Sequence, residues 1–94
     1  MTARIKRRVK RELATERPTI WIGKEGNTVE TIGEIDRQLE TREMVKIRIL
    51  NTALKEEKAE NLALQVAEQT SSLLVEVRGH TFMLFRRRKK RQDK

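Results

Sequence analysis

Hydrophobic residues recur along the chain with two different periods. Residues 3–14 carry Ile5, Val9 and Leu13 four positions apart, so all three share one face of a helix. Residues 44–50 instead alternate between apolar and charged side chains, which is typical of a half-buried strand. The pattern therefore predicts a fold that mixes helices with strands.

Two longer helices are predicted further along the chain. The first is capped by Asn27, with Glu30 three residues later as its capping-box partner, and it ends near Thr41. The second is capped by Asn51 or Thr52. Each has an apolar stripe at helical spacing, formed by Val29, Ile32, Ile35 and Leu39 in the first and by Ala59, Leu62, Ala63, Val66 and Ala67 in the second. Both helices are expected to cover one face of a sheet.

Three further strands complete the predicted sheet, at residues 19–22, 72–78 and 81–86. Gly79-His80 joins the last two as a turn with glycine first, as a type II′ hairpin requires. The order is α-β-α-β-α-β-β, an α/β fold with three helices and a four-stranded mixed sheet. Strands 19–22 and 81–86 are apolar on both faces, which predicts central positions and the strand order 2-1-4-3. The expected residues of the sheet face under the first helix are Trp21, Leu74, Met83 and Phe85.

Composition removes several classes of function. The chain has 94 residues, enough for one small domain, and no cysteine, which excludes disulfides, thiolate zinc sites and cysteine nucleophiles. Its single histidine, His80, lies in the predicted turn, and no nucleophile is paired with an acid or base. We therefore expect neither an enzyme nor a bound cofactor, metal or small-molecule substrate. Without a long apolar run or a secretory signal, the expected location is cytoplasmic, away from any membrane.

Charge is concentrated at the two ends of the chain. The 22 Lys and Arg outnumber the 14 Asp and Glu, giving a net charge of +8. Residues 1–17 carry a net +5 and residues 86–94 a net +6, whereas residues 18–85 carry −3. A basic end is often only a solvated terminus, but a fold that brings both ends together would form one surface for a polyanion. We divide the chain into a domain over residues 1–86 and a basic tail over residues 87–94.

A glycine pair lies between the first strand and the second helix. The segment reads Gly23-Lys24-Glu25-Gly26, and free N–H groups at a helix N-terminus favour an anion such as phosphate. A tight strand-to-helix turn explains the two glycines equally well, and the carboxylate of Glu25 disfavours phosphate. The loop lacks the Gly-Lys-Ser/Thr ending of a Walker A motif and the third glycine of a dinucleotide fingerprint.

Three side chains of the strands have a structural and a functional interpretation. A strand tryptophan in so small a domain is expected in the core more often than against a base, so we assign Trp21 to the core. Lys46 and Arg48 form either a solvated strand face or contacts to a nucleic-acid backbone.

Three segments together resemble a known family. They are residues 22–29 (Ile-Gly-Lys-Glu-Gly-Asn-Thr-Val), residues 42–49 (Arg-Glu-Met-Val-Lys-Ile-Arg-Ile) and residues 77–86 (Val-Arg-Gly-His-Thr-Phe-Met-Leu-Phe-Arg). Their order is similar to that of the CRM domain (chloroplast RNA splicing and ribosome maturation) in its stand-alone YhbY-like form, over roughly residues 3–86. Two positions depart from the family pattern, because Arg42 replaces a frequent histidine and Phe85 a tyrosine.

The resemblance implies a fold similar to the C-terminal domain of bacterial translation initiation factor three. It also implies RNA binding with the GxxG loop against the backbone, and for single-domain members a role in assembly of the large ribosomal subunit. The expected partner is rRNA or a pre-ribosomal particle, bound by a monomer. Charge and resemblance together predict these RNA contacts: Arg4, Arg7, Arg8, Arg11, Gly23, Lys24, Glu25, Gly26, Asn27, Arg86, Arg87 and Arg88.

Two other functions compete with this one. An Alba-like protein that coats DNA or RNA has a related order of elements, but it should dimerise and bind duplex DNA cooperatively. A protein that docks on a ribosomal protein or an enzyme through its acidic middle should bind almost independently of salt, whereas phosphate-dominated binding weakens steeply as salt rises.

Overall fold

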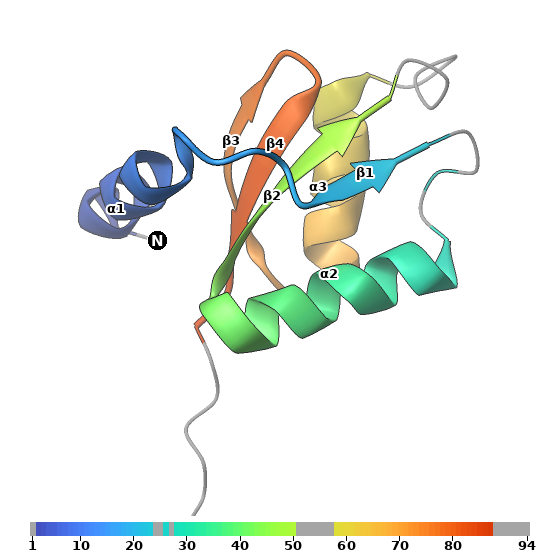
Figure 1. Ribbon diagram of the computed structural model, residues 1–94, viewed down its shortest axis with the longest axis horizontal. Helices are drawn as coiled ribbons and strands as arrows, with labels where there is room; N and C mark the ends of the chain where they lie inside the picture. The colour runs from blue at the N-terminus through green and yellow to red at the C-terminus, as the bar shows by residue number, and fades with distance from the viewer. Residues whose placement is uncertain (1, 24–25, 27, 51–57, 88–94) are drawn as a thin grey trace, which may run out of the picture.

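The computed structural model describes residues 2–23, 26, 28–50 and 58–87 (Figure 1). Its elements are α1 (Ala3–Leu13), β1 (Ile20–Ile22), α2 (Val29–Arg42), β2 (Met44–Ile49), α3 (Ala59–Gln69), β3 (Leu73–Arg78) and β4 (Thr81–Phe85). Among the described residues, the predicted order and the α/β class, with three helices and a four-stranded mixed sheet, are therefore confirmed.

The strand order corrects the predicted arrangement. The sheet runs β1-β2-β4-β3, with β1 parallel to β2 and the other neighbours antiparallel, so the order 2-1-4-3 is wrong. The two central strands are β2 and β4, so the central position predicted for the last strand is confirmed. Strand β2 is central although Lys46 and Arg48 give it a charged face, and the three-residue β1 lies at the edge. A charged face is possible on a central strand here because helix α1 covers only part of that side of the sheet.

The main core lies between the sheet and the two longer helices. Ile35 and Leu39 of α2, with Leu62 and Val66 of α3, pack against a sheet face that includes Phe82. All five side chains are buried. Figure 1 shows α2 and α3 on this side of the sheet and α1 apart from them. The predicted stripes of both helices are thus confirmed as core except at Val29, which is 86% exposed, while Ile32 and Ala59 are only partly buried against it.

A second, smaller core lies under α1. Val9 and Leu13 are buried there against Met44, Met83 and Phe85, with Ile5 packed at the margin and Val75 completing the cluster. The prediction that the first helix covers this face is confirmed for Met83 and Phe85. It is wrong for Trp21, which is 53% exposed, and for Leu74, which packs against the main core instead.

A bulge in β3 explains the position of Leu74. The pairing with β4 shifts between Leu74 and Glu76, so Val75 is an extra residue in the ladder. Beyond the shift, Glu76 pairs with Met83 and its side chain faces α1. A strict alternation from Leu74 would have placed the Glu76 side chain on the opposite face, in the main core.

The turn and cap predictions had mixed outcomes. Gly79 has φ +59° and His80 has no positive φ, as expected for glycine first in a type II′ turn. The cap of α2 is Thr28, whose side chain accepts a bond from the Thr31 N–H, and not Asn27. The predicted caps Asn51 and Thr52 lie outside the described residues, and they are not the cap of α3, which begins at Ala59 with Lys58 in the cap position.

Candidate nucleic-acid interface

Helix α1 separates an apolar side from an arginine side. Thr2 caps the helix by accepting a bond from the Ile5 N–H at 3.2 Å. The apolar stripe faces the sheet, and the rest of the helix is basic. Four guanidinium side chains at helical spacing line a shallow hollow of about 400 Å³ beside Ile5, and they belong to Arg4, Arg7, Arg8 and Arg11.

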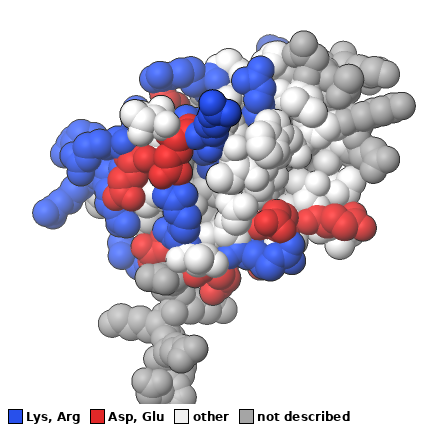
Figure 2. All heavy atoms as spheres, viewed as in Figure 1, with Lys and Arg blue, Asp and Glu red and all other residues white. Residues whose placement is uncertain are grey.

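The four arginines differ in their partners. Arg8 pairs with Glu12 at 3.1 Å and approaches Glu43 at 3.9 Å. Among the described residues, Arg4, Arg7 and Arg11 have no ion pair. Like charges at this spacing repel one another, so an anion in the hollow would relieve the repulsion. Figure 2 shows Lys and Arg side chains gathered over the α1 side of the molecule.

Polar contacts fix the C-terminal end of α1 to the sheet. The Lys46 ammonium donates to the carbonyl oxygens of Leu13 and Glu16, at 2.8 and 2.9 Å. The Leu13 carbonyl, at the end of α1, also accepts from the Glu16 N–H, so Lys46 adds a second donor to it and holds the segment after the helix against β2. Lys46 therefore has a structural role in this conformation, which is neither the solvated strand face nor the nucleic-acid contact considered from the sequence.

An ion pair joins this segment to the end of α2. Arg42 donates from both terminal nitrogens to the two carboxylate oxygens of Glu16, each at 2.9 Å. The hydrogen bond from Arg42 lowers the pKa of Glu16 below its ordinary value, and the same contact raises that of Arg42. Arg42, one of the two residues that depart from the family pattern, thus helps to orient the chain that follows α1.

The glycine loop forms a tight entry into α2. The Gly26 N–H donates to the Gly23 carbonyl at 2.9 Å, and Gly26 has φ +70°, a conformation that favours glycine. The Thr28 N–H then donates to the Gly26 carbonyl. The predicted contacts Lys24, Glu25 and Asn27 lie outside the described residues.

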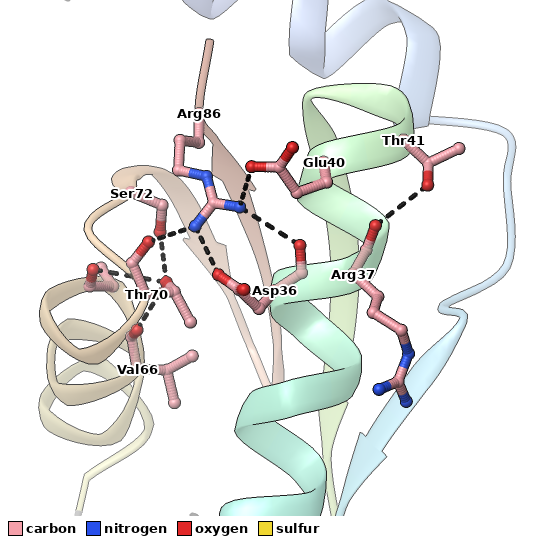
Figure 3. Close-up of polar contacts among 9 residues, drawn as sticks. Asp36, Arg37, Glu40, Thr41, Val66, Thr70, Ser72 and Arg86 are labelled. Carbon is pink, nitrogen blue, oxygen red and sulfur yellow. Dashed lines mark hydrogen bonds and ion pairs between the residues drawn. The ribbon is translucent and has the colours of Figure 1, made fainter. Parts of the chain in front are cut away.

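The Arg86 side chain is hydrogen-bonded to other residues of the domain (Figure 3). One terminal nitrogen donates to Asp36 Oδ1 at 2.6 Å and to the Thr70 carbonyl at 2.7 Å. The other donates to Glu40 Oε2 and to the Asp36 carbonyl, both at 3.2 Å. Only 18% of the Arg86 side chain is exposed. Arg86 therefore ties α2 and the end of α3 to β4, and we do not retain it as an RNA contact.

The following residues are less constrained. Arg87 is exposed, and its guanidinium carbon lies 6.0 Å from the centre of the Phe85 ring, within cation–π range. The predicted contact Arg88 lies outside the described residues.

The fold brings α1 and the end of β4 together but not the loop. Glu43 receives the Arg86 N–H on its carbonyl and approaches Arg8 with its carboxylate. The loop follows Ile22, which pairs with Ile49 at the opposite end of β2. With about 3.3 Å per strand residue, roughly 16 Å of β2 separates these ends. The hypothesis of one continuous surface is therefore wrong with respect to the loop (Figure 1).

Two exposed residues on the sheet were not among the predicted RNA contacts. Trp21 and Arg48 pair across β1 and β2 and are both exposed. The apolar sequence Ile-Trp-Ile suggested a buried strand, and only the edge position of β1 reveals the exposure. The charged alternation at Lys46 and Arg48 was the available signal for an open sheet face.

The described part of the chain contains neither a candidate metal site nor a candidate membrane-spanning helix. No group of three or more His, Cys, Asp or Glu side chains could hold a metal ion there. Over the same residues, none of the helices has the length and apolar character needed to cross a membrane.

Comparison with known proteins identifies relatives over almost the full chain. The family model described as the CRS1 / YhbY (CRM) domain matches residues 1–86. "Probable RNA-binding protein MJ0652" of Methanocaldococcus jannaschii is 34% identical over 88 residues, which are 94% of this chain and 65% of that relative. The solution structure of hypothetical protein SAV1595 from Staphylococcus aureus, described as a candidate RNA-binding protein, matches with a TM-score of 0.71 at 28% identity, covering 100% of this chain and 94% of that one.

Proposed function

The chain belongs to the CRS1/YhbY (CRM) domain family, and from this premise we propose that it binds RNA through the arginine side of α1. One relative is named as an RNA-binding protein and the structural neighbour is described in the same terms, which supports RNA as the polyanion. The match covers only 65% of the length of the curated relative, so the rest of that protein has no counterpart in the match.

The observation that carries the proposal is the hollow lined by four arginines. Arg4, Arg7 and Arg11 have no ion pair among the described residues, and their helix is anchored by Val9 and Leu13 in the second core. The cations are thus presented on a rigid element. Guanidinium groups bind phosphate oxygens in a bidentate way, and such contacts position a backbone without reading its sequence.

The Gly23–Gly26 loop is proposed as a second contact area. Gly26 adopts a left-handed conformation before the cap at Thr28, so the backbone can approach a phosphate at the start of α2. Lys24, Glu25 and Asn27 complete the proposed contact. Since the loop and α1 lie at different ends of the sheet, one RNA must span both areas, which favours a folded RNA over a short linear one.

We propose further that this RNA is rRNA and that the protein acts in assembly of the large ribosomal subunit. The resemblance of residues 22–29, 42–49 and 77–86 to stand-alone members of the family supports this assignment. The proposal includes a cytoplasmic, monomeric protein without catalytic activity. Arg87, at the start of the tail, extends the basic area near α1, and Arg88 is proposed as a further RNA contact.

Fluorescence anisotropy with a labelled hairpin of large-subunit rRNA tests the proposal. We expect Arg7→Gln combined with Arg11→Gln to weaken binding about tenfold or more, because two charge-assisted phosphate contacts are lost. Lys24→Gln combined with Gly26→Asp tests the loop, and we expect weaker binding from a folded protein. Arg37→Gln is the matched control, because Arg37 is exposed on α2 and pairs only with Glu34 among the described residues.

Unchanged affinity of the folded Arg7/Arg11 variant would contradict the role of α1, and unchanged affinity of the loop variant would contradict the role of the loop. Tighter binding to duplex DNA than to the hairpin, together with a dimer in light scattering, would instead favour the Alba-like coating protein.

A further inference from the structure

Helix α1 leaves part of its side of the sheet uncovered. The register places four residues in one row across the strands, on the same face as α1, and they are Trp21, Arg48, Thr81 and Arg78. Neighbouring strands lie about 4.8 Å apart, so the row is roughly 14 Å long. None of the four belongs to the buried cluster under α1. This row, here called the open row, is distinct from the arginine hollow.

Trp21 is unusually accessible for its type. Its side chain is 53% exposed, whereas its neighbours Ile20 and Ile22 are buried in the main core on the opposite face. Leu50, two positions after Arg48 and thus on the same face, is also 39% exposed. Exposed apolar side chains cost hydrophobic free energy, and contiguous exposed apolar surface often marks an interaction site.

Positive charge adjoins this apolar surface. Arg48 is exposed, and within the described residues its guanidinium has no ion pair. Lys10 lines a hollow of about 300 Å³ between α1 and the sheet, which Arg78 and Thr81 of the open row also line. Arg78 pairs with Glu76 at 3.0 Å and adds less net charge. An aromatic side chain beside an unpaired arginine suits a ligand that is both flat and anionic.

We propose that Trp21 stacks an unpaired nucleobase of RNA while Arg48 contacts the adjacent phosphate. The proposal rests on the RNA binding proposed above and names the part of the RNA that this face takes. The indole presents a π-face to any base, so stacking is tolerant of sequence. Bases inside an A-form duplex are already stacked and paired, so the occupant must be a single-stranded segment, loop or bulge.

The position of the glycine loop supports the same occupant. Trp21 precedes Gly23 by two residues, and a Cβ atom added at Gly23 would lie 3.7 Å from Leu50 Cδ1. Gly23 and Leu50 therefore lie side by side, and the Leu50 N–H donates to the carbonyl of Ile22, the residue after Trp21. An RNA strand whose phosphate approaches the loop can place a neighbouring base on Trp21 without crossing the domain.

The intrinsic fluorescence of Trp21 is a probe for this contact. Trp21 is the only tryptophan, and the chain has no tyrosine, so its fluorescence reports on this site alone. We expect a single-stranded uridine 12-mer to quench the emission of the unmodified full chain. An abasic 12-mer with the same phosphates, and a fully paired RNA duplex of equal length, should leave most of the emission unchanged.

Affinity measurements separate stacking from charge. Trp21→Thr should weaken binding of the labelled 12-mer by about 5- to 100-fold, and Trp21→Phe by less, because a phenyl ring still stacks. Neither substitution should alter binding of the abasic strand by more than about twofold. Leu64→Ala is the matched control, since Leu64 is 51% exposed on α3, at the far side of the sheet. Circular dichroism and urea unfolding establish that each variant is folded.

Each alternative result has a defined meaning. If the Arg7/Arg11 variant loses RNA but Trp21→Thr does not, and no quenching occurs, the stacking site is wrong while RNA binding stands. Equal quenching by the duplex or the abasic strand would also overturn stacking. If no RNA binds to the unmodified chain, both proposals fail. An emission change that follows protein concentration without RNA, with a doubled mass in light scattering, would assign the open row to a second copy.

Discussion

At the scale of single residues, Arg86 shows how position in a sequence can mislead. It begins a run of basic residues, so composition assigned it to a polyanion surface. In the fold it donates to Asp36 and Glu40, which are 50 and 46 positions away in the chain. No local pattern indicates partners so distant, whereas the exposed Arg4, Arg7 and Arg11 were identifiable from helical spacing alone.

Replacing Arg86 with lysine should reduce the free energy of unfolding by about 1–2 kcal/mol, because an ammonium cannot reproduce the forked contacts to Asp36, Glu40 and the Thr70 carbonyl. Urea unfolding measures the loss. The matched control is Arg87→Lys, which should change stability by less than about 0.5 kcal/mol because Arg87 is exposed. Equal effects at both positions would refute the structural assignment of Arg86.

The pair of Glu16 and Arg42 should make a small, pH-dependent contribution to stability. The Arg42 hydrogen bond holds the pKa of Glu16 below 4.5 in the folded state, so the unfolded state binds its proton first as pH falls. Stabilisation is therefore complete above pH 4.5 and is lost as the pH falls through the folded-state pKa. Since both side chains are more than a third exposed, its size should be less than about 1 kcal/mol.

Urea unfolding of the unmodified chain and of Glu16→Gln, from pH 7 down to pH 3, measures this contribution. The difference between the two proteins should be largest near neutral pH and should shrink in the acidic range. A difference that stays constant with pH would mean that Glu16 stabilises the fold without its charge.

At the scale of elements, α1 was predictable and the place of β1 was not. The spacing of Ile5, Val9 and Leu13 is a local property, and the structure buries Val9 and Leu13 as that spacing predicts. The position of a strand in a sheet depends on long-range pairing. Ile20-Trp21-Ile22 is apolar on both faces, as a central strand would be, yet its pairing with β2 leaves it at the edge.

The attachment of α1 can be measured through Leu13. Its side chain is 1% exposed, so Leu13→Ala should cost about 2–4 kcal/mol of unfolding free energy by leaving a cavity in the second core. The control Val29→Ala removes an apolar side chain that is 86% exposed, and it should change stability by less than about 0.5 kcal/mol. A loss below about 1 kcal/mol for Leu13→Ala would contradict a firmly packed α1, and with it the fixed presentation of the arginines.

At the scale of the whole molecule, the fold separates the basic helix from the glycine loop. The basic helix and the end of β4 meet at Glu43, on the side of the molecule away from the glycine loop. The sequence identified both basic ends and the loop as candidates. Their relative placement follows from strand register, which is not visible in composition or periodicity. The RNA is therefore proposed to contact two separated areas, α1 and the glycine loop, with the open row beside the loop.

The salt dependence of RNA binding tests the central claim most directly. Each phosphate neutralised by a cation contributes about −0.7 to −0.9 to the slope of log K against log salt. Anisotropy titrations with the rRNA hairpin should therefore give a slope that falls in magnitude by about 2–3 when Arg4, Arg7 and Arg11 are all changed to glutamine. The control Arg37→Gln should leave the slope unchanged. An identical slope for the folded triple variant and the unmodified chain would contradict RNA binding through α1.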